Sequence, residues 1–150
     1  MAEPFLCTVA TPDMDLYTGQ VYYAGVPGAD GSFGVMRGHQ LMVATNGEGI
    51  LKLNLDEAGN DVRTFLVYHG ATQMFNNVLT VCARFGIETT KIDPEITKER
   101  IQIIKDHLEK LQKELEKDPD SDTLKSRIGT TEDHLTWYEL QDRYNNGEVH

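Results

Sequence analysis

The chain has 150 residues, of which 39% are apolar and 25% charged, a balance that predicts a folded globular protein with one sizeable core or two small ones. Fourteen Lys and Arg against 24 Asp and Glu give a formal net charge of -10, which repels nucleic-acid phosphates and anionic membrane surfaces and argues against nucleic acid as a partner. No run approaches the roughly 20 apolar residues of a membrane-spanning helix, and no basic stretch precedes an apolar one at the start, so we expect neither direct membrane insertion nor secretion.

The first part of the sequence predicts β-strands. From Phe5 to about Glu88, short apolar runs with a two-residue alternation are broken by Gly, Asn and Asp. These runs span residues 5–10, 20–26, 50–55, 64–68 and 78–83. Residues 56–61 and the pair Asn76–Asn77 predict turns. Because no helical segments intervene, the pattern favours an antiparallel β-sandwich or flattened barrel over residues 1–90.

One run shows the alternation clearly. Leu51, Leu53 and Leu55 share a face, while Lys52 and Asn54 point the other way. This is the pattern of a half-buried antiparallel strand, so we expect the three leucines to face the core.

At Ile92-Asp93-Pro94 the period changes to that of a helix, since Asp caps helix N-termini and Pro is tolerated at the first helical position. This helix is expected to stop at Asp118-Pro119-Asp120, and a second one to end near residues 145–147. In the first helix, apolar side chains recur at three- and four-residue spacing at Ile101, Ile104, Leu108, Leu111 and Leu115. The second helix repeats this spacing at Leu124, Ile128, Thr131, Leu135 and Tyr138, of which only Thr131 is polar. Residues 91–150 therefore predict an antiparallel two-helix hairpin with a narrow apolar seam.

Gly129 is the weak point of the second helix. The following residues 130–133 resemble a capping box, so the sequence leaves open whether this helix is continuous, kinked or split. Each helix would be about 35 Å long, with a seam only about five apolar side chains deep. We therefore expect the hairpin to be marginal by itself and to be the element that moves.

A search for catalytic and metal-binding patterns finds no candidate. The glycines at 28, 31, 34 and 38 precede no helical pattern, and no serine lies in a G-x-S-x-G motif. The five histidines form no i, i+4 pair and have no cysteine at ligand spacing, so we predict no metal site and no cofactor. Cys7 and Cys82 lie far apart in strand-like runs, which favours reduced core thiols in a cytoplasmic compartment over a disulfide or a zinc site.

The most distinctive segment, Pro27–His39, has four glycines in thirteen residues and by itself indicates a tight corner of a sandwich. It follows T-P-D-M-D-L-Y-T-G at 11–19. Further matching segments come in order at Gly49–Leu53, His69-Gly70, Val78–Val81 and Ile92-Asp93. This ordered set resembles the epsilon subunit of F-type ATP synthases over essentially the whole chain, with the pattern T-P-x-x-x-L-(Y/F)-x-G followed by P-G-x-D-G-x-(F/L)-G-(V/I)-x-P-G-H.

The resemblance implies a flattened antiparallel β-sandwich followed by a helical hairpin, and a non-catalytic role in the rotor. In that family the sandwich contacts the gamma subunit and the c-ring, and the hairpin can restrain ATP hydrolysis at the alpha/beta catalytic head. Such a subunit couples proton translocation to ATP synthesis as a peripheral protein on the cytoplasmic face of the bacterial plasma membrane. By position, the c-ring contact falls on Asp30, Ser32, Arg37 and His39, with a local backbone contact in the turn as the alternative role for His39.

The sequence departs from the family pattern at three places. Arg37 and Leu41 stand where the family usually has prolines, which makes the loop less stiff and adds a positive charge. The segment 92–97 lacks the Arg and Ala of relatives that bind ATP on the hairpin, so we predict weak or no ATP binding. Residues 121–145 hold three basic against five acidic side chains, which leaves inhibition of hydrolysis open, because that activity in relatives depends on basic residues.

The sequence also allows a role outside an ATP synthase. The alternative is a free-standing β-sandwich interaction module with a coiled-coil arm that dimerises through the seam at 101–115. A small β-domain enzyme has almost no residue support.

Overall fold

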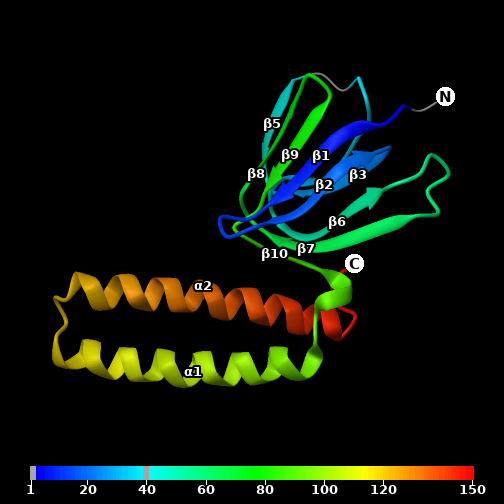
Figure 1. Ribbon diagram of the computed structural model, residues 1–150. Coiled ribbons are helices and arrows are strands. Elements are labelled where there is room, and N and C mark those ends of the chain that lie inside the picture. The colour runs from blue at the N-terminus through cyan, green and yellow to red at the C-terminus, as the bar shows by residue number, and fades with distance from the viewer. Residues whose placement is uncertain (1–2, 39–40) are drawn as a thin grey trace. The chain divides into compact units, whose positions relative to one another are not determined.

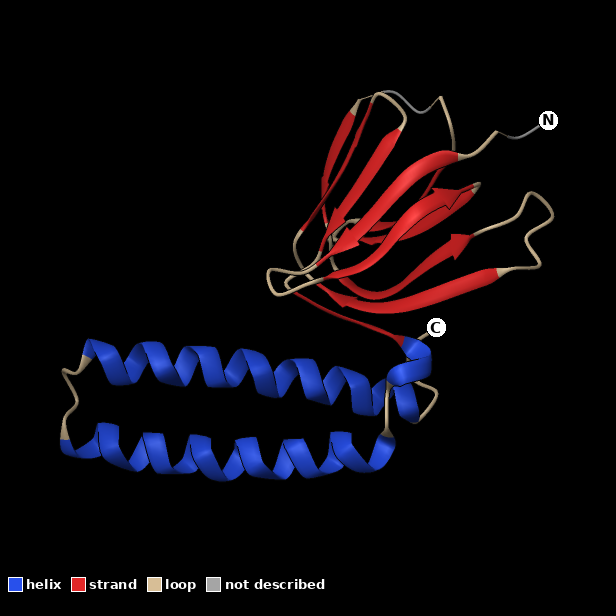
Figure 2. Cartoon of the chain, viewed as in Figure 1, coloured by secondary structure: helices blue, strands red, loops and turns tan. Residues whose placement is uncertain are grey.

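The computed structural model describes residues 3–38 and 41–150. The chain separates into two compact units, the first ending at Lys91 and the second spanning Ile92–Val149. The first unit is built of strands and the second of helices (Figure 2).

Within the described part of the first unit, ten strands form two five-stranded sheets. Their bounds are β1 Phe5–Ala10, β2 Asp15–Val21, β3 Tyr23–Gly28, β4 Gly31–Val35, β5 Met42–Thr45, β6 Glu48–Asn54, β7 Val62–Tyr68, β8 Ala71–Phe75, β9 Val78–Cys82 and β10 Phe85–Glu88, and a short 3-10 helix, η1, follows at Thr89–Lys91. The first sheet has the order β2-β1-β9-β8-β5 and the second the order β10-β7-β6-β3-β4 (Figure 1). The predicted β-sandwich is thereby confirmed.

The core lies between the two sheets and follows the predicted alternation. Leu51 and Leu53 of β6 are completely buried, and Leu55 packs partly buried against the same cluster, as the sequence predicted. From the opposite sheet, β1 contributes Phe5 and Val9. Burying one such side chain stabilises the fold by about 1.5–3 kcal/mol, which is why the two-residue period fixes the face that each strand turns inward.

One pair of the described strands departs from the antiparallel pattern of the rest. β1 and β9 run parallel, from Leu6 opposite Val78 to Ala10 opposite Cys82. A tight turn forces neighbouring strands to be antiparallel, but the long stretch between β1 and β9 passes through both sheets and allows either direction. The predicted run at 20–26 also covers parts of two strands, because β2 ends at Val21 and β3 begins at Tyr23.

The second unit is the predicted helical hairpin, formed by α1 (Pro94–Lys117) and α2 (Asp122–Asn145) (Figure 1). The Asp93 carboxylate accepts hydrogen bonds from the backbone N–H groups of the first turn of α1, at 2.9 and 3.3 Å, so the predicted cap is confirmed. Ser121 caps α2 in the same way. Neither of these 24-residue helices is apolar enough to cross a membrane.

α2 is continuous through Gly129, which settles the question that the sequence left open. The hydroxyl of Thr131 donates to the carbonyl of Arg127 one turn earlier, at 2.7 Å, instead of capping a new helix. Half-buried side chains on both sides of Gly129, such as Ile128 and Leu135, keep α2 packed along α1, and this packing offsets a cost of about 1 kcal/mol for one glycine.

Candidate functional site

The glycine-rich segment forms a hairpin at the edge of the second sheet. β3 and β4 pair from Gly28 opposite Gly31 to Ala24 opposite Val35, and Asp30 lies in the turn between them. Gly31 has a φ of 127°, a conformation that side chains rarely adopt, and a Cβ at Gly28 would lie 2.6 Å from the carbonyl oxygen of Gly31. The tight turn therefore needs glycine at both positions.

The structure does not bring the residues expected at the c-ring contact together. Asp30 and Ser32 are exposed at one end of β4, whereas Arg37 lies beyond its other end. An extended chain advances about 3.3 Å per residue, so Ser32 and Arg37 are separated by about 16 Å along the strand direction. His39 lies outside the residues that the structure describes.

The far end of this segment is tied to other parts of the sandwich. Nη1 of Arg37 donates to the carbonyl of Pro4 at 2.9 Å, and its Nε lies 3.2 Å from the carboxylate of Glu3. The N–H of Gly38 donates to the side-chain oxygen of Asn77 at 2.9 Å. Asn77 has a φ of 58° in the predicted turn after β8. Sequence analysis identified that turn but missed its contact with the glycine-rich segment, because pattern does not show which loops meet.

The outward side of the first sheet is a second candidate surface, which we call the uncharged face. In β1, Phe5, Cys7 and Val9 point into the core, so the residues between them point outward. The same alternation gives the members of the uncharged face as Leu6, Thr8 and Ala10 of β1, Thr18 and Gln20 of β2, Val43 and Thr45 of β5, Ala71, Gln73 and Phe75 of β8, and Val78, Thr80 and Cys82 of β9. None of these described side chains carries a charge, and the exposed Asp15 of β2, opposite Ala10, is the charged residue at the margin of this face.

The apolar members of the uncharged face meet at one end of the sheet. The strand registers place Leu6 beside Val78 and Val78 beside Phe75, with exposures of 36%, 37% and 53%. Five strands span about 19 Å, since neighbouring strands lie about 4.8 Å apart. An apolar or neutral patch of this width is unusual in a chain with 25% charged residues and is typical of a protein interface.

Cys82 belongs to the uncharged face and is exposed, which corrects the expectation of two core thiols. Leu79 and Val81 turn into the core, so the alternation of β9 turns Cys82 outward. Cys7 is buried as expected, and burial raises the pKa of its thiol to about 12. The Cys7 thiol therefore stays protonated and unreactive.

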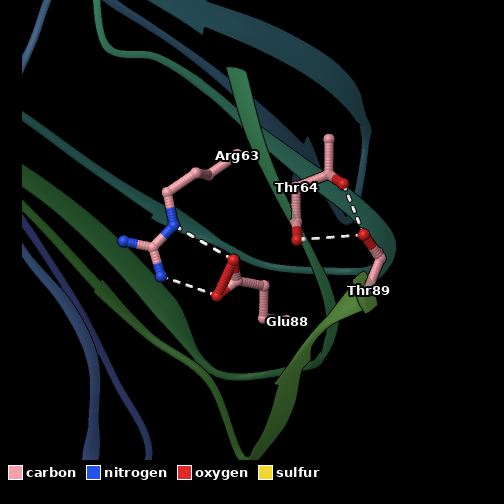
Figure 3. Close-up of polar contacts among 4 residues, drawn as sticks. All are labelled: Arg63, Thr64, Glu88 and Thr89. Carbon is pink, nitrogen blue, oxygen red and sulfur yellow. Dashed lines mark hydrogen bonds and ion pairs between the residues drawn. The ribbon is translucent and has the colours of Figure 1, made fainter. Parts of the chain in front are cut away.

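A polar clamp fixes β10 to β7, just before the helical unit begins (Figure 3). The Arg63 guanidinium donates to both carboxylate oxygens of Glu88, at 3.1 and 2.6 Å. Beside this pair, the hydroxyls of Thr64 and Thr89 are 2.6 Å apart, and Thr89 also donates to the Thr64 carbonyl. We call these four residues the β7–β10 clamp. It joins the end of the last strand and the start of η1 to the sandwich.

The clamp changes the ionisation of both charged members. The hydrogen bonds from Arg63 lower the pKa of Glu88 below its ordinary value of 4.5, because they favour the ionised carboxylate. The same hydrogen bonds raise the pKa of the Arg63 guanidinium. The Arg63 guanidinium also lies over the rings of Tyr17 and Phe65, at 5.1 and 5.5 Å from their centroids. Sequence analysis did not identify this clamp, because its members are about 25 residues apart in the chain.

In the helical unit, Leu111 is buried, and Ile101, Ile104, Leu108, Leu115, Leu124, Ile128, Leu135 and Tyr138 are half-buried. Near the C-terminal end of α2, Trp137, Leu140 and Gln141 are also buried. The Gln141 side-chain oxygen lies 3.5 Å from the hydroxyl of Thr97 in α1. The apolar pattern did not indicate Trp137 and Leu140, which lie close in sequence to the seam position Tyr138, or Gln141, which is polar.

The described part of the chain contains no cluster of metal ligands. Among those residues, no group of three or more His, Cys, Asp or Glu is placed so that it could hold a metal ion. The two candidate surfaces are an uncharged sheet face and an exposed glycine-rich edge, and both suit contact with other proteins better than the binding of a small molecule.

Comparison with known proteins gives one consistent result. The family model for the ATP synthase delta/epsilon chain, beta-sandwich domain, matches residues 5–88. An ATP synthase epsilon chain from Maridesulfovibrio salexigens is 31% identical over 93 residues, which cover 62% of this chain and 63% of that relative. The ATP synthase epsilon chain of Rhodopseudomonas palustris is 28% identical over 131 residues, covering 84% of this chain and 95% of the relative, so this match reaches into the helices.

The fold itself has a counterpart among solved structures. A chain in the cryo-EM structure of the Euglena gracilis mitochondrial ATP synthase, OSCP/F1/c-ring in rotational state 1, aligns with a TM-score of 0.60 and 14% identity, covering 95% of this chain and 81% of that one. The family model spans more than half of the sequence, and it covers the described strands from β1 to β10. The chain therefore belongs to the ATP synthase delta/epsilon chain family.

Proposed function

We propose that this chain is the non-catalytic epsilon subunit of the central stalk of an F-type ATP synthase. It links the gamma subunit to the c-ring, so that proton translocation drives ATP synthesis, and it lies peripherally at the cytoplasmic face of the bacterial plasma membrane. Residues 1–90 bind the rotor and residues 91–150 modulate hydrolysis at the alpha/beta head. The family match over the sandwich supports this role over the free-standing module with a coiled-coil arm.

The uncharged face is the surface that we assign to the gamma subunit. A subunit that transmits torque needs a contact that does not slip, and a wide neutral sheet face buries area without the cost of desolvating charges. Apolar members such as Val43, Phe75 and Val78 supply the area, while threonines supply hydrogen bonds at its centre. This face is the observation on which the assignment to gamma depends.

The c-ring contact is assigned to the two ends of β4, with Asp30 and Ser32 at one end and Arg37 beyond the other. His39, which the structure does not describe, is kept in the proposed contact by its place in the sequence alone. Polar side chains at these ends suit the polar loops that a c-ring exposes, since hydrogen bonds and screened charges orient a contact without a large apolar area. The salt bridge between Arg37 and Glu3 is exposed on both sides and contributes little, which leaves Arg37 available to a partner.

A matched pair of charge substitutions tests the assignment to gamma. Gln73→Lys places a cation within the uncharged face, on an exposed position of β8 between Val43 and Thr80. Gln112→Lys adds the same charge on the exposed side of α1. We expect Gln73→Lys to weaken binding to purified gamma subunit at least tenfold, because its ammonium is desolvated without a partner, and Gln112→Lys to change binding less than twofold. Equal binding by both variants would remove the uncharged face from the interface, and failure of the unaltered chain to bind gamma at micromolar concentration would contradict the rotor function.

A further inference from the structure

The two sides of the sandwich differ in how their strand edges are protected. On one side, the edge strands β2 and β10 contact each other. On the other side, among the strands that the structure describes, β4 pairs only with β3, and β5 pairs only with β8. An unpaired edge exposes backbone N–H and C=O groups, which natural proteins usually protect with charged residues, proline or a covering segment.

The ladder between β3 and β4 shows which backbone groups of β4 face outward. Pro27, which lies opposite Ser32, has no N–H, and its carbonyl accepts from the N–H of Gly47 at 2.8 Å, on the side away from β4. Hydrogen-bonded and non-hydrogen-bonded pairs alternate in an antiparallel ladder, so Phe33 is bonded to β3, whereas Ser32 and Gly34 direct their N–H and C=O groups to the open edge. These two residues thus present donors and acceptors at the spacing of a strand.

Two of the usual protections, charged residues and proline, are missing from the described strands at this edge. The sequence of β4 is Gly-Ser-Phe-Gly-Val and that of β5 is Met-Val-Ala-Thr, so neither described strand contains a charged residue or a proline. Three of the most exposed apolar side chains lie in or next to these strands: Met36 (59%) directly after β4, Leu41 (68%) directly before β5 and Val43 (73%) within β5. The edge therefore has both free backbone groups and apolar side chains for a partner.

β4 is also held in a strand conformation despite its glycines. The ring of Tyr23 packs across Gly34, where a Cβ would lie 2.6 Å from the Tyr23 hydroxyl and 2.8 Å from a ring carbon. An aromatic ring placed over glycine in a neighbouring strand stiffens a strand that would otherwise be flexible. A partner segment would therefore meet an edge that is already extended, which lowers the entropy cost of binding.

We propose that β4 accepts an added strand, supplied by an extended, uncharged segment of another subunit of the complex. This inference rests on the proposed function, and it explains how a single partner segment reaches both ends of β4, from Ser32 to Arg37. A second copy of this chain is disfavoured as the occupant, because two copies with a net charge of -10 repel each other. Strand addition takes its affinity from main-chain hydrogen bonds, and alternate side chains then set its specificity.

Hydrogen exchange in the assembled ATP synthase tests the proposal directly. The amide hydrogens of Ser32 and Gly34 are expected to exchange at least tenfold more slowly in the complex than in the free chain. Those of Phe33 and Val35, bonded to β3 in both states, provide the internal control. If the chain assembles and the Ser32 and Gly34 amides exchange as fast as before, no strand is added at β4, although the rotor function stands.

Two substitutions separate a backbone contact from a side-chain contact. Ser32→Pro removes the outward N–H and leaves the ladder to β3, whereas Ser32→Ala keeps the N–H and removes only the hydroxyl. We expect Ser32→Pro to weaken incorporation into the complex at least tenfold more than Ser32→Ala, which measures the part that the hydroxyl plays in the proposed c-ring contact. Equal effects of the two variants, or dimerisation of the free chain through this edge in sedimentation, would overturn the proposal. If Ser32→Pro does not fold by circular dichroism, the exchange measurement decides.

Failure of the proposed function gives a different result. In that case the unaltered chain does not enter the complex at all, and Gln73→Lys and Ser32→Pro are indistinguishable from it. That outcome overturns both proposals, whereas normal incorporation of Ser32→Pro overturns only the added strand.

Discussion

A single buried amide holds together three turns at one end of the sandwich. Asn46 is completely buried, and its Nδ2 donates to the carbonyls of His69 and Cys82, at 3.3 and 3.2 Å. Its Oδ1 accepts from the hydroxyl of Thr72 at 2.6 Å. Asn46 thus satisfies buried polar groups that the neighbouring strands leave without partners.

Replacing Asn46 by Ala should lower the free energy of unfolding by about 2–3 kcal/mol, because a buried polar group left without its partner costs about 1–3 kcal/mol. Urea unfolding measures this as a lower midpoint with an unchanged slope. Asn60→Ala, in the exposed loop after β6, is the matched control and should change stability by less than about 0.5 kcal/mol. An Asn46→Ala variant as stable as the control would show that water replaces the amide.

At the scale of elements, two glycines, one inside α2 and one just after it, should affect stability in opposite directions when each is replaced by alanine. Gly129 lies inside the helix, and a Cβ there meets nothing within 4 Å, so Gly129→Ala should stabilise the chain by about 0.5–1 kcal/mol. Gly147 follows the helix with a φ of 76°, so Gly147→Ala should destabilise it by about 1 kcal/mol. Thermal melting, followed by the circular dichroism of the helices, measures the stability change of each variant. A shift of both melting temperatures in the same direction would contradict this account of the helix end.

The β7–β10 clamp predicts a pH dependence of stability. Because the pKa of Glu88 is lowered in the folded chain, its contribution is fully present above the ordinary value of 4.5 and is lost as the pH falls through the lower folded value. Arg63 is partly exposed, so we expect the pair to contribute only about 1 kcal/mol. Glu88→Gln should therefore be less stable than the unaltered chain at pH 7, and the difference should shrink below pH 4.5.

The urea unfolding midpoints of the Glu88→Gln variant and of the unaltered chain, measured between pH 2.5 and 7, give this difference in stability. Glu99→Gln removes an exposed carboxylate from α1 and is the control for the loss of one negative charge. A stability difference between the Glu88→Gln variant and the unaltered chain that stays constant down to the lowest pH would mean that the hydrogen bonds from Arg63 do not depend on the charge of Glu88.

These elements also show how far the sequence alone leads. Local rules placed β1, the turn at Asn76–Asn77 and the start of α1 correctly, because alternation, turn residues and capping act over a few neighbouring positions. They did not predict the parallel pairing of β1 with β9 or the exposure of Cys82, because both depend on which distant strands become neighbours. The uncharged face and the clamp escaped prediction for the same reason, whereas the family resemblance did identify the glycine-rich edge.

At the scale of the whole molecule, the two units differ in how much core each contains. The main cluster of buried apolar side chains lies within the sandwich, from Phe5 to Ala83, whereas the apolar side chains buried in the helical unit are Leu111, Trp137 and Leu140. The helical unit has a seam that is mostly half-buried, and residues 92–150 contain 15 acidic against nine basic side chains. Most of the stability of the chain should therefore come from the sandwich.

A chain shortened to residues 1–91 should consequently fold by itself, unfold cooperatively in urea and bind the gamma subunit with an affinity within about twofold of the full chain. It keeps the core, the uncharged face and the β7–β10 clamp, which ends at Thr89. Residues 92–150 alone should show a broad thermal transition, because two helices with one narrow seam nucleate poorly. Loss of cooperative unfolding in the 1–91 chain would mean that the hairpin is an integral part of the fold, and weakened gamma binding by a well-folded 1–91 chain would place part of the interface on the helices.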